Sequence, residues 1–363
     1  MIKLILKIPY ILYQKTKLLN ASDAYWERKL KGKTLALDGR QLNPRAQGLF
    51  NLQEQLAIPA AKWSKGLMRG GYRKSIELFD GPKAPVKNVE DINIELEGRT
   101  LGGRLYNDEN LDTAGPCLLY FHGGGFVIGD LETHDGLCRK LALETGQSVL
   151  AVDYRLGPES RYPAAMEDAL DCWRWLQTNG ARHNIDAANM SVAGDSAGAA
   201  LAILVAAMAS KGDLGYLPIA AGLIYPPSPG IETTKSRELL GSEKILLTQE
   251  LLDWFAGNFM TADARADDTY LGALSNAVSG KMPPSWILTC GFDPLRDDGV
   301  HVASKIRELG ADVEFQEYEG LYHGFIGASA LFPEVDQMVQ GMSAFIRKQQ
   351  AKAIENQAVT AAE

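Results

Sequence analysis

The sequence predicts an α/β protein, with one large and mostly parallel sheet covered by helices on both faces and a helical cap. Three observations lead to this expectation. Short apolar runs typical of strands alternate with helical patterns along most of the 363 residues, which favours a parallel sheet. A Gly-x-Ser-x-Gly motif stands where a strand gives way to a helix. About sixty residues separate two of the later strands, more than a crossover needs.

Eight strands and two helix starts can be located by pattern. The strands are expected to begin near Ile92, Arg104, Cys117, Ser148, Met190, Ala221, Trp286 and Val313. One helix is expected over 44–56, because Asn43 suits the cap and Pro44 the first helical position. Another is expected over 249–260, with Thr248 as its N-cap.

Residues 194–198 read Gly-Asp-Ser-Ala-Gly, between the strand-like Met190–Ala193 and the helix-like Ala199–Ala209. In a strand-to-helix turn of this kind the serine is held in a strained conformation, and the two glycines let neighbouring chain come close. The context predicts that Ser196 is a nucleophile.

A glycine-rich loop, His122-Gly-Gly-Gly-Phe126, follows the strand-like Pro116–Phe121. Successive glycines expose backbone N–H groups, which acyl transfer needs because a carbonyl oxygen becomes an oxyanion in the transition state. The alternatives are a flexible turn and a phosphate cradle. A phosphate loop would end in Gly-Lys-Ser/Thr, whereas Phe126-Val127-Ile128 offers neither lysine nor hydroxyl. An oxyanion hole is therefore the better interpretation.

A nucleophilic serine on such a turn needs an acid and then a histidine further along the chain. Of the five histidines, only His301 and His323 follow Ser196. His301 falls in an expected helix that starts near Asp297 and should carry it away. His323 follows the strand-like 313–319 and stands in a glycine-flanked loop, which favours it as the base.

The acid should also follow a strand. Asp293 comes just after the strand-like 286–290. Asp297 and Asp298 remain runners-up, although they look more like the cap and first-turn residues of the next helix. The predicted triad is Ser196, Asp293 and His323, recognised by role rather than by spacing.

These motifs resemble the hormone-sensitive-lipase family of esterases, in its bacterial Gly-Asp-Ser-Ala-Gly type. The resemblance covers about residues 85 to 345 and comprises six blocks in the family's order: His122–Asp130, Asp153–Glu159, Tyr162–Ala165, Gly194–Gly198, Asp293–Gly299 and His323–Phe325. It implies an α/β-hydrolase fold and supports the same triad.

The resemblance also implies further roles. It places oxyanion donors at the backbone of Gly124, Gly125 and Ala197. It makes His122 a structural residue that orients the glycine loop and moves no proton.

Three positions depart from the family's pattern. Gly157 stands where alanine is usual, Ala199-Ala200 stand where Gly-Asn or similar is usual, and Pro227–Gly230 replace a hydroxyl and an aspartate. The last stretch is expected near the pocket wall, so it bears on substrate size.

The expected domain organisation has three parts. A Gly/Pro-rich linker at 81–85 ends an N-terminal helical segment, 1–85, that forms part of the cap. Residues 86–350 form the α/β-hydrolase catalytic domain, with a cap insertion at about 228–283. Residues 351–363 are expected to be a flexible tail.

Other charged and aromatic residues near the motifs have structural interpretations. Arg155, Glu159 and Asp168 are expected to form a charge network that braces their proline-containing loop, since ion pairs also cluster near active sites. Trp254 and Phe255 could line the cap side of the pocket, although aromatic residues at helical spacing are more often core.

Composition narrows the compartment and the partners. The four cysteines are widely spaced, and neither Cys-x-x-Cys nor His-Glu-x-x-His occurs, so no disulfide framework and no zinc site is indicated. Reduced, buried thiols suit a cytoplasmic protein. A net charge of −8 argues against nucleic acid. The expected partner is a small-molecule ester, and the chemistry requires no metal and no cofactor.

Residues 1–33 hold eight Lys or Arg against two acidic residues, a balance of +6 in a chain of net charge −8. Their apolar start is interrupted by Lys3, Lys7 and Pro9, which makes it too short for a membrane span and unlike a secretory signal. The first interpretation is a basic amphipathic helix that packs on the cap, or on a partner chain in a homodimer. Peripheral membrane contact through 1–33 is the alternative.

The predicted function is a serine carboxylesterase acting on short- to medium-chain acyl esters through an acyl-enzyme, because a cap and the proline-rich Pro226–Pro229 would limit chain length. Alternatives that use the same residues are a lipase on longer-chain or membrane-interfacial esters, an amidase or peptidase, and an inactive hydrolase that only binds. The intact triad argues against the last of these.

Overall fold

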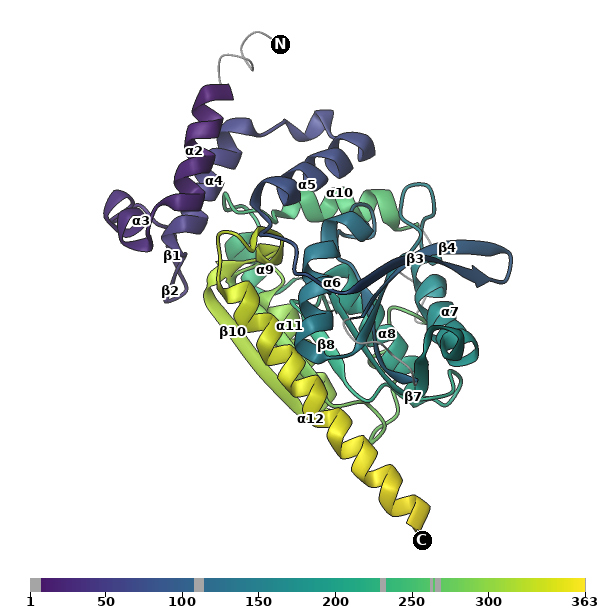
Figure 1. Ribbon diagram of the computed structural model, residues 1–363. Helices are drawn as coiled ribbons and strands as arrows, with labels where there is room; N and C mark the ends of the chain where they lie inside the picture. The colour runs from purple at the N-terminus through teal and green to yellow at the C-terminus, as the bar shows by residue number, and fades with distance from the viewer. Residues whose placement is uncertain (1–7, 108–113, 229–232, 262–263, 265–268, 363) are drawn as a thin grey trace.

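One eight-stranded sheet forms the centre of the molecule (Figure 1). The computed structural model of the protein describes residues 8–107, 114–228, 233–261, 264 and 269–362. The strand order is β10-β9-β8-β7-β5-β6-β4-β3. The strands are β3 (Asn88–Leu96), β4 (Arg99–Asn107), β5 (Gly115–Phe121), β6 (Ser148–Asp153), β7 (Ile185–Asp195), β8 (Ala221–Ile224), β9 (Ser285–Phe292) and β10 (Val313–Tyr322).

The pairing is parallel from β10 to β6 and antiparallel where β4 joins β6 and β3 joins β4. The predicted fold class, an eight-stranded and mostly parallel α/β sheet, is confirmed. All eight predicted starts fall within these strands. The signal was strongest for the central strands, because strands buried on both faces consist of continuous apolar runs.

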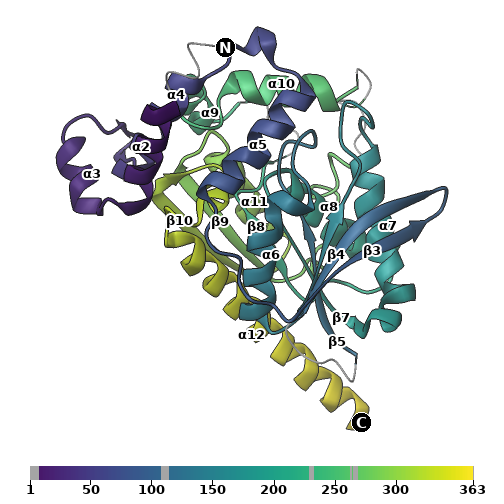
Figure 2. The ribbon, with the colours of Figure 1, turned by 45° about the horizontal axis from the view of Figure 1, so that its top comes forward.

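Helices cover both faces of the sheet (Figure 2). On one side lie α6 (Leu131–Thr145) and α12 (Glu334–Ala362), and on the other α7 (Ala164–Asn179), α8 (Ala197–Ser210) and α11 (Arg296–Glu308). Alternation along β5 supplies both cores. Leu118 and Tyr120 face α6 and α12, whereas Leu119 and Phe121 face α7 and α8. Short 3-10 helices occur at η2 (Gly180–His183) and η4 (Phe325–Ala328).

The N-terminal segment lies at the carboxyl end of β10 and extends above the sheet (Figure 1). It contains α2 (Ile8–Asn20), α3 (Asp23–Lys29), the hairpin of β1 (Ala36–Leu37) and β2 (Arg40–Gln41), α4 (Pro44–Leu56), η1 (Ala60–Lys62) and α5 (Lys65–Phe79). Asn43 caps α4 by accepting from Arg45 N at 2.8 Å, as predicted. Leu18 and Trp26 are buried between α2, α3 and α4.

The connection from β8 to β9 contains α9 (Lys235–Leu240) and α10 (Gln249–Phe259). Thr248 caps α10 by accepting from Leu251 N at 3.2 Å, as predicted. In both ribbon views α10 lies beside α5 (Figures 1 and 2). Trp63, just before α5, meets Trp254 of α10 edge to face at 6.2 Å.

The chain end is the part that was expected to form a flexible tail over 351–363. α12 continues to Ala362. Nine of the thirteen residues 351–363 are Ala, Glu, Gln or Lys, five of them Ala, and these are strong helix formers. A helix that is already nucleated gains one hydrogen bond for each residue it adds, so these residues prolong α12. Within the described residues, none of the helices has both the length and the apolar character that crossing a bilayer requires.

Candidate active site

Ser196 lies between β7 and α8, at a sharp turn of the backbone. Its φ and ψ are 53° and −120°, a region that costs a non-glycine residue about 1–3 kcal/mol. Its N–H donates to Ile224 O at 2.9 Å, which fixes the turn to β8. A Cβ at Gly198 would stand 1.9 Å from Phe121 O, so only glycine allows this close approach. The backbone at Ser196 therefore forms the sharp, strained strand-to-helix turn that the motif predicts.

The structure brings Ser196, His323 and Asp293 together in one chain of hydrogen bonds. His323 Nε2 is 2.8 Å from Ser196 Oγ, and its Nδ1 is 2.7 Å from Asp293 Oδ2. Leu295 N donates to the other carboxylate oxygen, Asp293 Oδ1, at 2.7 Å. With Nδ1–H donated to Asp293, Nε2 is left to accept from the serine hydroxyl, the arrangement that a general base needs.

The runners-up are placed elsewhere. His301 is exposed on α11. Asp297 accepts from Ser236 N at 2.8 Å, and Asp298 pairs with Arg237 at 2.6 Å. Both aspartates lie in the first turn of α11 and join it to α9, which accounts for them without a role in the chemistry.

The glycine loop takes a conformation that other residues would resist. Gly124 and Gly125 have φ of +116° and +60°, and a Cβ at Gly124 would lie 2.2 Å from Ile128 O. Within the described part of the chain, the amides of Gly124, Gly125 and Ala197 donate no hydrogen bond. Free amides on both sides of a nucleophile are what an oxyanion hole requires.

His122 is buried against Tyr154, with ring centroids 4.4 Å apart in a stacked pair. Its Nδ1 lies 2.8 Å from Gly123 O. Burial, and then the neighbouring His134, lower the pKa of His122 to about 4. The ring is therefore neutral near neutral pH, which suits the structural role expected for it.

Asp195, for which no role was predicted, holds the glycine loop to the serine turn. It accepts from Tyr120 OH at 2.7 Å and from Gly123 N at 2.8 Å, and His134 Nε2 is 3.2 Å away. Burial by itself would raise the pKa of Asp195, but His134 and then Tyr120 outweigh it and leave the pKa below its ordinary value. Its position beside Ser196 in the motif was the signal that could have found it.

Tyr225 was also missed. It directly follows β8, and its ring centroid is 4.3 Å from that of His323. Its N–H donates to Leu288 O at 2.6 Å, which attaches it to β9. Tyr225 therefore packs beside the imidazole, and its place at the carboxyl end of a strand could have indicated this.

The charged residues of the proline-containing loop form two networks instead of the single one expected. Arg155 pairs with Asp168 at 2.8 Å and braces the loop from α7. Glu159 pairs with Lys65 at 2.6 Å and with Arg69 at 2.9 Å, both on α5. Glu159 therefore connects the loop to the N-terminal segment. Sequence alone could not predict this connection, because it does not show which acidic side chain pairs with which basic one.

The departure at Gly157 has a steric reason. A Cβ there would lie 2.6 Å from Asn258 O and 3.1 Å from Phe259 Cα. The usual alanine would push α10 away, so this glycine allows the helix to approach the loop. The departure at Pro227–Gly230 lies partly outside the described residues, which end at 228 and resume at 233.

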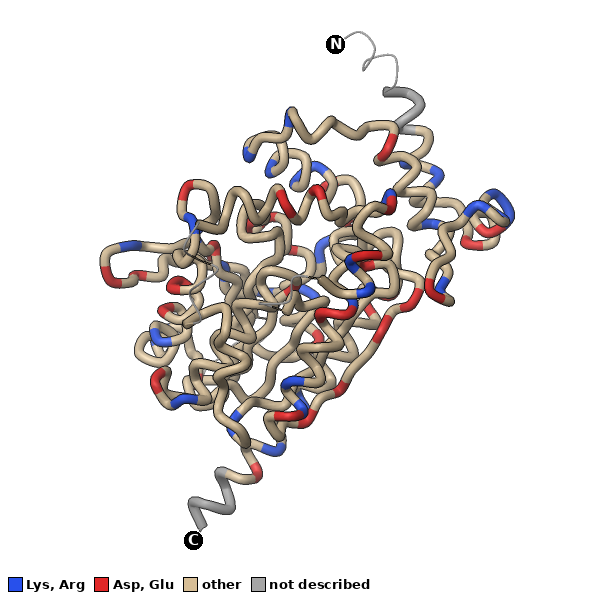
Figure 3. The backbone as a smooth tube through the Cα atoms, turned by 180° about the vertical axis from the view of Figure 1, so that it is seen from behind, with Lys and Arg blue, Asp and Glu red and all other residues tan. Residues whose placement is uncertain are grey.

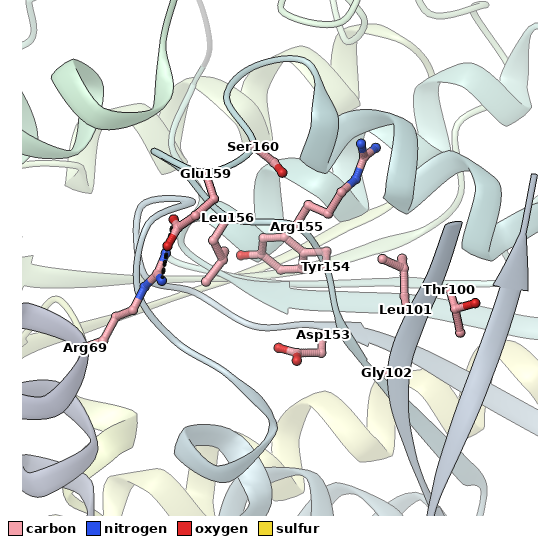
Figure 4. Close-up of a pocket in the computed structure, with 10 residues that line it drawn as sticks. All are labelled: Arg69, Thr100, Leu101, Gly102, Asp153, Tyr154, Arg155, Leu156, Glu159 and Ser160. Atoms are coloured by element: carbon pink, nitrogen blue, oxygen red, sulfur yellow. Dashed lines mark hydrogen bonds and ion pairs between the residues drawn. The ribbon is translucent and has the colours of Figure 1, made fainter. Parts of the chain in front are cut away.

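A hollow of about 390 Å³ lies beside this loop, between α5 and β4 (Figure 4). Its lining includes the Arg69–Glu159 pair, Asp153 and Tyr154. No member of the Ser196 chain of hydrogen bonds lines it, so the hollow is separate from the candidate chemistry. Among the described residues, no group of three or more His, Cys, Asp or Glu is placed to hold a metal ion.

Comparison with known proteins agrees with this geometry. A family model described as "alpha/beta hydrolase fold" matches residues 118–327. An ethyl acetate hydrolase of Pseudomonas putida is 35% identical over 273 residues, 74% of this chain and 85% of that protein. Esterase LipI of Mycobacterium tuberculosis is 35% identical over 70% of this chain and 81% of its own. A hyperthermophilic esterase from Pyrobaculum calidifontis superposes with a TM-score of 0.77 at 32% identity, over 85% of this chain and 98% of that one.

These matches are long enough, and similar enough, to establish the relationship. The chain belongs to the α/β-hydrolase superfamily, in the family of hormone-sensitive-lipase-like esterases.

Proposed function

We propose that the protein is a serine carboxylesterase, with Ser196 as nucleophile, His323 as base and Asp293 as the acid that orients it. The observation that carries this proposal is the continuous chain of hydrogen bonds from Ser196 Oγ through His323 to Asp293, at 2.8 and 2.7 Å. The esterase relatives support the same reaction class.

The reaction follows from that chain. His323 Nε2 takes the proton of Ser196 Oγ as the oxygen attacks the ester carbonyl, and Asp293 stabilises the imidazolium. The carbonyl oxygen becomes an oxyanion, which the amides of Gly124, Gly125 and Ala197 receive. The tetrahedral intermediate then collapses, the alcohol leaves with the proton from His323, and an acyl-enzyme remains. Water enters by the same path and releases the acid.

Phe255 and Leu246 support a preference for short acyl chains. A Cβ at Gly125 would meet the Phe255 ring at 2.4 Å, and one at Gly324 would meet Leu246 Cδ2 at 3.2 Å. The cap insertion therefore contacts both the glycine loop and the loop of His323. Close walls limit the length of chain that fits. The name of the relative from Pseudomonas putida, ethyl acetate hydrolase, is consistent with a small ester.

The cap is proposed to consist of residues 1–85 and the insertion at about 228–283. The Trp63–Trp254 contact and the pairs of Glu159 with α5 support this division. Leu18, Trp26 and Leu30 of the N-terminal segment are buried on neighbouring helices, which favours packing over membrane contact for 1–33. Residues 1–7 lie outside the described part of the chain. A cytoplasmic location and a homodimer remain proposals.

The test is covalent labelling of the wild-type protein. An organophosphonate should add one label, located by peptide mass spectrometry on Ser196, and p-nitrophenyl butyrate hydrolysis should fall in proportion. Ser196→Ala should abolish both. Labelling at another residue together with full activity of this variant would overturn the assignment.

The chain-length profile tests the proposed substrate class. Activity should be highest on acetate to hexanoate esters and should fall on longer ones. A rise on emulsified long-chain ester above that on butyrate would favour the lipase alternative. Salt-sensitive co-sedimentation with anionic vesicles, lost on removal of residues 1–33, would favour membrane contact.

A further inference from the structure

A small hairpin in the N-terminal segment touches the strands that precede the acid and the base. Its strands β1 and β2 pair antiparallel, with Ala36 opposite Gln41 and Leu37 opposite Arg40. The two turn residues, Asp38 and Gly39, have φ of +54° and +77°. Two consecutive positive φ values define the tight type I′ turn that Asp-Gly favours. The hairpin thus presents the Asp38 carboxylate from a short loop of defined geometry.

Arg40 and Asn43 attach this hairpin to β10, whose end leads into His323. Arg40 Nε is 2.5 Å from Glu317 Oε1, and Asn43 N donates to Gly320 O at 2.8 Å. Figure 3 shows acidic positions along this edge strand, to which Arg40 supplies a positive charge. A Cβ at Gly291 would lie 2.8 Å from Arg40 Cδ, so the Arg40 stem also packs on β9, just before Asp293.

Asp38 reaches the loop of the acid itself. Its Oδ2 accepts from Arg296 Nη2 at 3.0 Å, and its Oδ1 accepts from Lys235 Nζ of α9 at 2.8 Å. The Arg296 side chain is only 5% exposed. The backbone amide of Arg296 donates to Asp293 O at 3.0 Å. Asp38 is thus one buried side chain away from the peptide of the triad acid.

Arg296 carries a nearly buried charge and therefore needs its anions. Its carboxylate partners among the described residues are Asp38 and its own neighbour Asp297, at 3.0 Å each. A buried guanidinium that loses one partner must move or recruit another, because an unpaired buried charge is costly. Movement of Arg296 would be passed to Asp293 through their shared backbone hydrogen bond. A misplacement of about 1 Å in a catalytic group can cost 100-fold in rate.

We infer that the hairpin over residues 36–43 is a clamp that fixes Asp293 relative to His323, with Asp38 as its positioning residue. This inference rests on the proposed serine-hydrolase function. The clamp joins three parts of the site at one point: the loop of the acid, the strand that precedes the base, and α9 of the cap insertion. Residues 36–43 lie outside the 118–327 covered by the family match.

The variant Asp38→Asn tests the clamp. Asparagine tolerates the left-handed conformation and Asn-Gly favours the same turn, so the substitution removes the charge and preserves the hairpin. We expect kcat for p-nitrophenyl butyrate to fall about 10-fold while KM changes less than 2-fold, since a misaligned triad affects chemistry more than substrate binding. The rate of phosphonylation of Ser196 should fall in the same proportion.

Two matched variants separate this role from general stabilisation and from an effect through the cap. Asp23→Asn removes another carboxylate of the N-terminal segment, which pairs with Arg45 at 2.7 Å, and should leave kcat and phosphonylation unchanged. Lys235→Met removes the other partner of Asp38 and should leave kcat within 2-fold, because Arg296 transmits the effect. In an Arg296→Met background, Asp38→Asn should have little further effect on kcat.

Four outcomes would overturn the clamp. One is a lower thermal midpoint of Asp38→Asn with unchanged kcat, which would make the hairpin merely structural. A change in KM alone, or a Lys235→Met variant that reproduces the loss of kcat, would place the effect in the cap. The fourth is full additivity with Arg296→Met. Failure of the wild-type protein to be labelled at Ser196 would instead count against the proposed function.

Discussion

The carboxyl edge of the sheet and the cap above it are held by different kinds of contact. At the edge, the groups that connect the loops are buried: Asp195 is 4% exposed and Asp293 0%. The cap is joined to the loop beneath it partly by Glu159, whose side chain is 43% exposed, and its two parts meet in one edge-to-face tryptophan pair. Buried charge-assisted hydrogen bonds contribute more than surface ion pairs. Changes at the edge should therefore abolish chemistry or folding, and changes in the cap should alter substrate choice.

The largest effect is expected at the base. His323→Ala should lower kcat by about 10⁴- to 10⁶-fold, because triad members act as a unit. His301→Ala, on the exposed side of α11, is the matched control and should stay within 2-fold of wild type. Stopped-flow and steady-state hydrolysis of p-nitrophenyl butyrate would measure both. An inactive His301→Ala variant would show that the wrong histidine has been chosen.

A smaller but still large effect is expected at Asp195. Asp195→Asn can keep an oxygen for the donors from Tyr120 and Gly123, which both bind Oδ1, but it removes the charge and puts an NH₂ group in place of Oδ2, which accepts from Tyr225 OH at 3.5 Å. Hydrogen bonds to charged groups are worth about 1.5–3 kcal/mol each, so we expect about 2–4 kcal/mol less stability in urea unfolding and roughly 10-fold lower kcat.

The other end of the same strand supplies the control for that variant. Asp186 accepts from Ala188 N at 3.0 Å near the start of β7. Asp186→Asn should cost less than about 1 kcal/mol, as surface substitutions usually do, and should leave kcat unchanged. If Asp195→Asn and Asp186→Asn lowered stability equally, burial at the carboxyl edge of the sheet would not explain the importance of Asp195.

Substitutions in the cap are expected to change the specificity for acyl-chain length. Phe255→Ala should open space beside Gly125 and raise the ratio of kcat/KM for octanoate over butyrate esters by about 10-fold, in the range that a few methylenes provide. Trp254→Ala removes the neighbouring ring, which faces Trp63, and should lower stability without changing the ratio. An unchanged ratio in Phe255→Ala would place the acyl chain elsewhere.

The smallest effect on stability should come from breaking the surface pair of Arg69 and Glu159. Arg69 donates to Glu159 and holds the pKa of that carboxyl at about 2. A carboxylate whose pKa is lower in the folded state than in the unfolded state stabilises the fold. This stabilisation is present at pH values above the unfolded pKa of about 4.5 and is lost as the pH falls towards 2. Glu159→Gln should thus cost about 0.2–1 kcal/mol at pH 7, with the difference shrinking below pH 4.

Denaturant unfolding of both proteins across this pH range measures that difference. Glu77→Gln breaks a pair within α5, Lys74–Glu77 at 2.6 Å, and serves as the control, since it does not join the cap to the body. A pH-independent difference between Glu159→Gln and wild type would show that the carboxylate charge is not what contributes.

The contrast between the carboxyl edge of the sheet and the cap also explains which features could be predicted from the sequence. The central strands were recognisable because burial on both faces requires continuous apolar runs, whereas the edge strands β3 and β10 are only partly buried. Ser196, Asp293 and His323 were identifiable because each follows a strand, and parallel strands bring their carboxyl ends to one edge of the sheet. The helix N-caps at Asn43 and Thr248 depend on local contacts, so they can be predicted from about four consecutive residues.

The missed contacts are non-local and chemically generic. Asp38 and Arg296 are separated by 258 residues, and nothing in either neighbourhood selects this pair from the chain's other charged residues. The same holds for Glu159 and α5. Residues 351–362 prolong α12, as their helix propensity favours, whereas the flexibility expected for this tail stays a prediction.

The contact of Arg40 with Glu317 spans 277 residues, and this has a consequence for synthesis. Ribosomes add about 5–20 residues per second, so the hairpin emerges on the order of 10–60 s before the strand that receives it. Ser196 is added only in the second half of that interval, and the chain then still lacks His323 and, for most of the remaining time, Asp293. Ester hydrolysis should therefore appear abruptly, when β10 docks at the sheet edge, and stalled chains ending before residue 323 should have none.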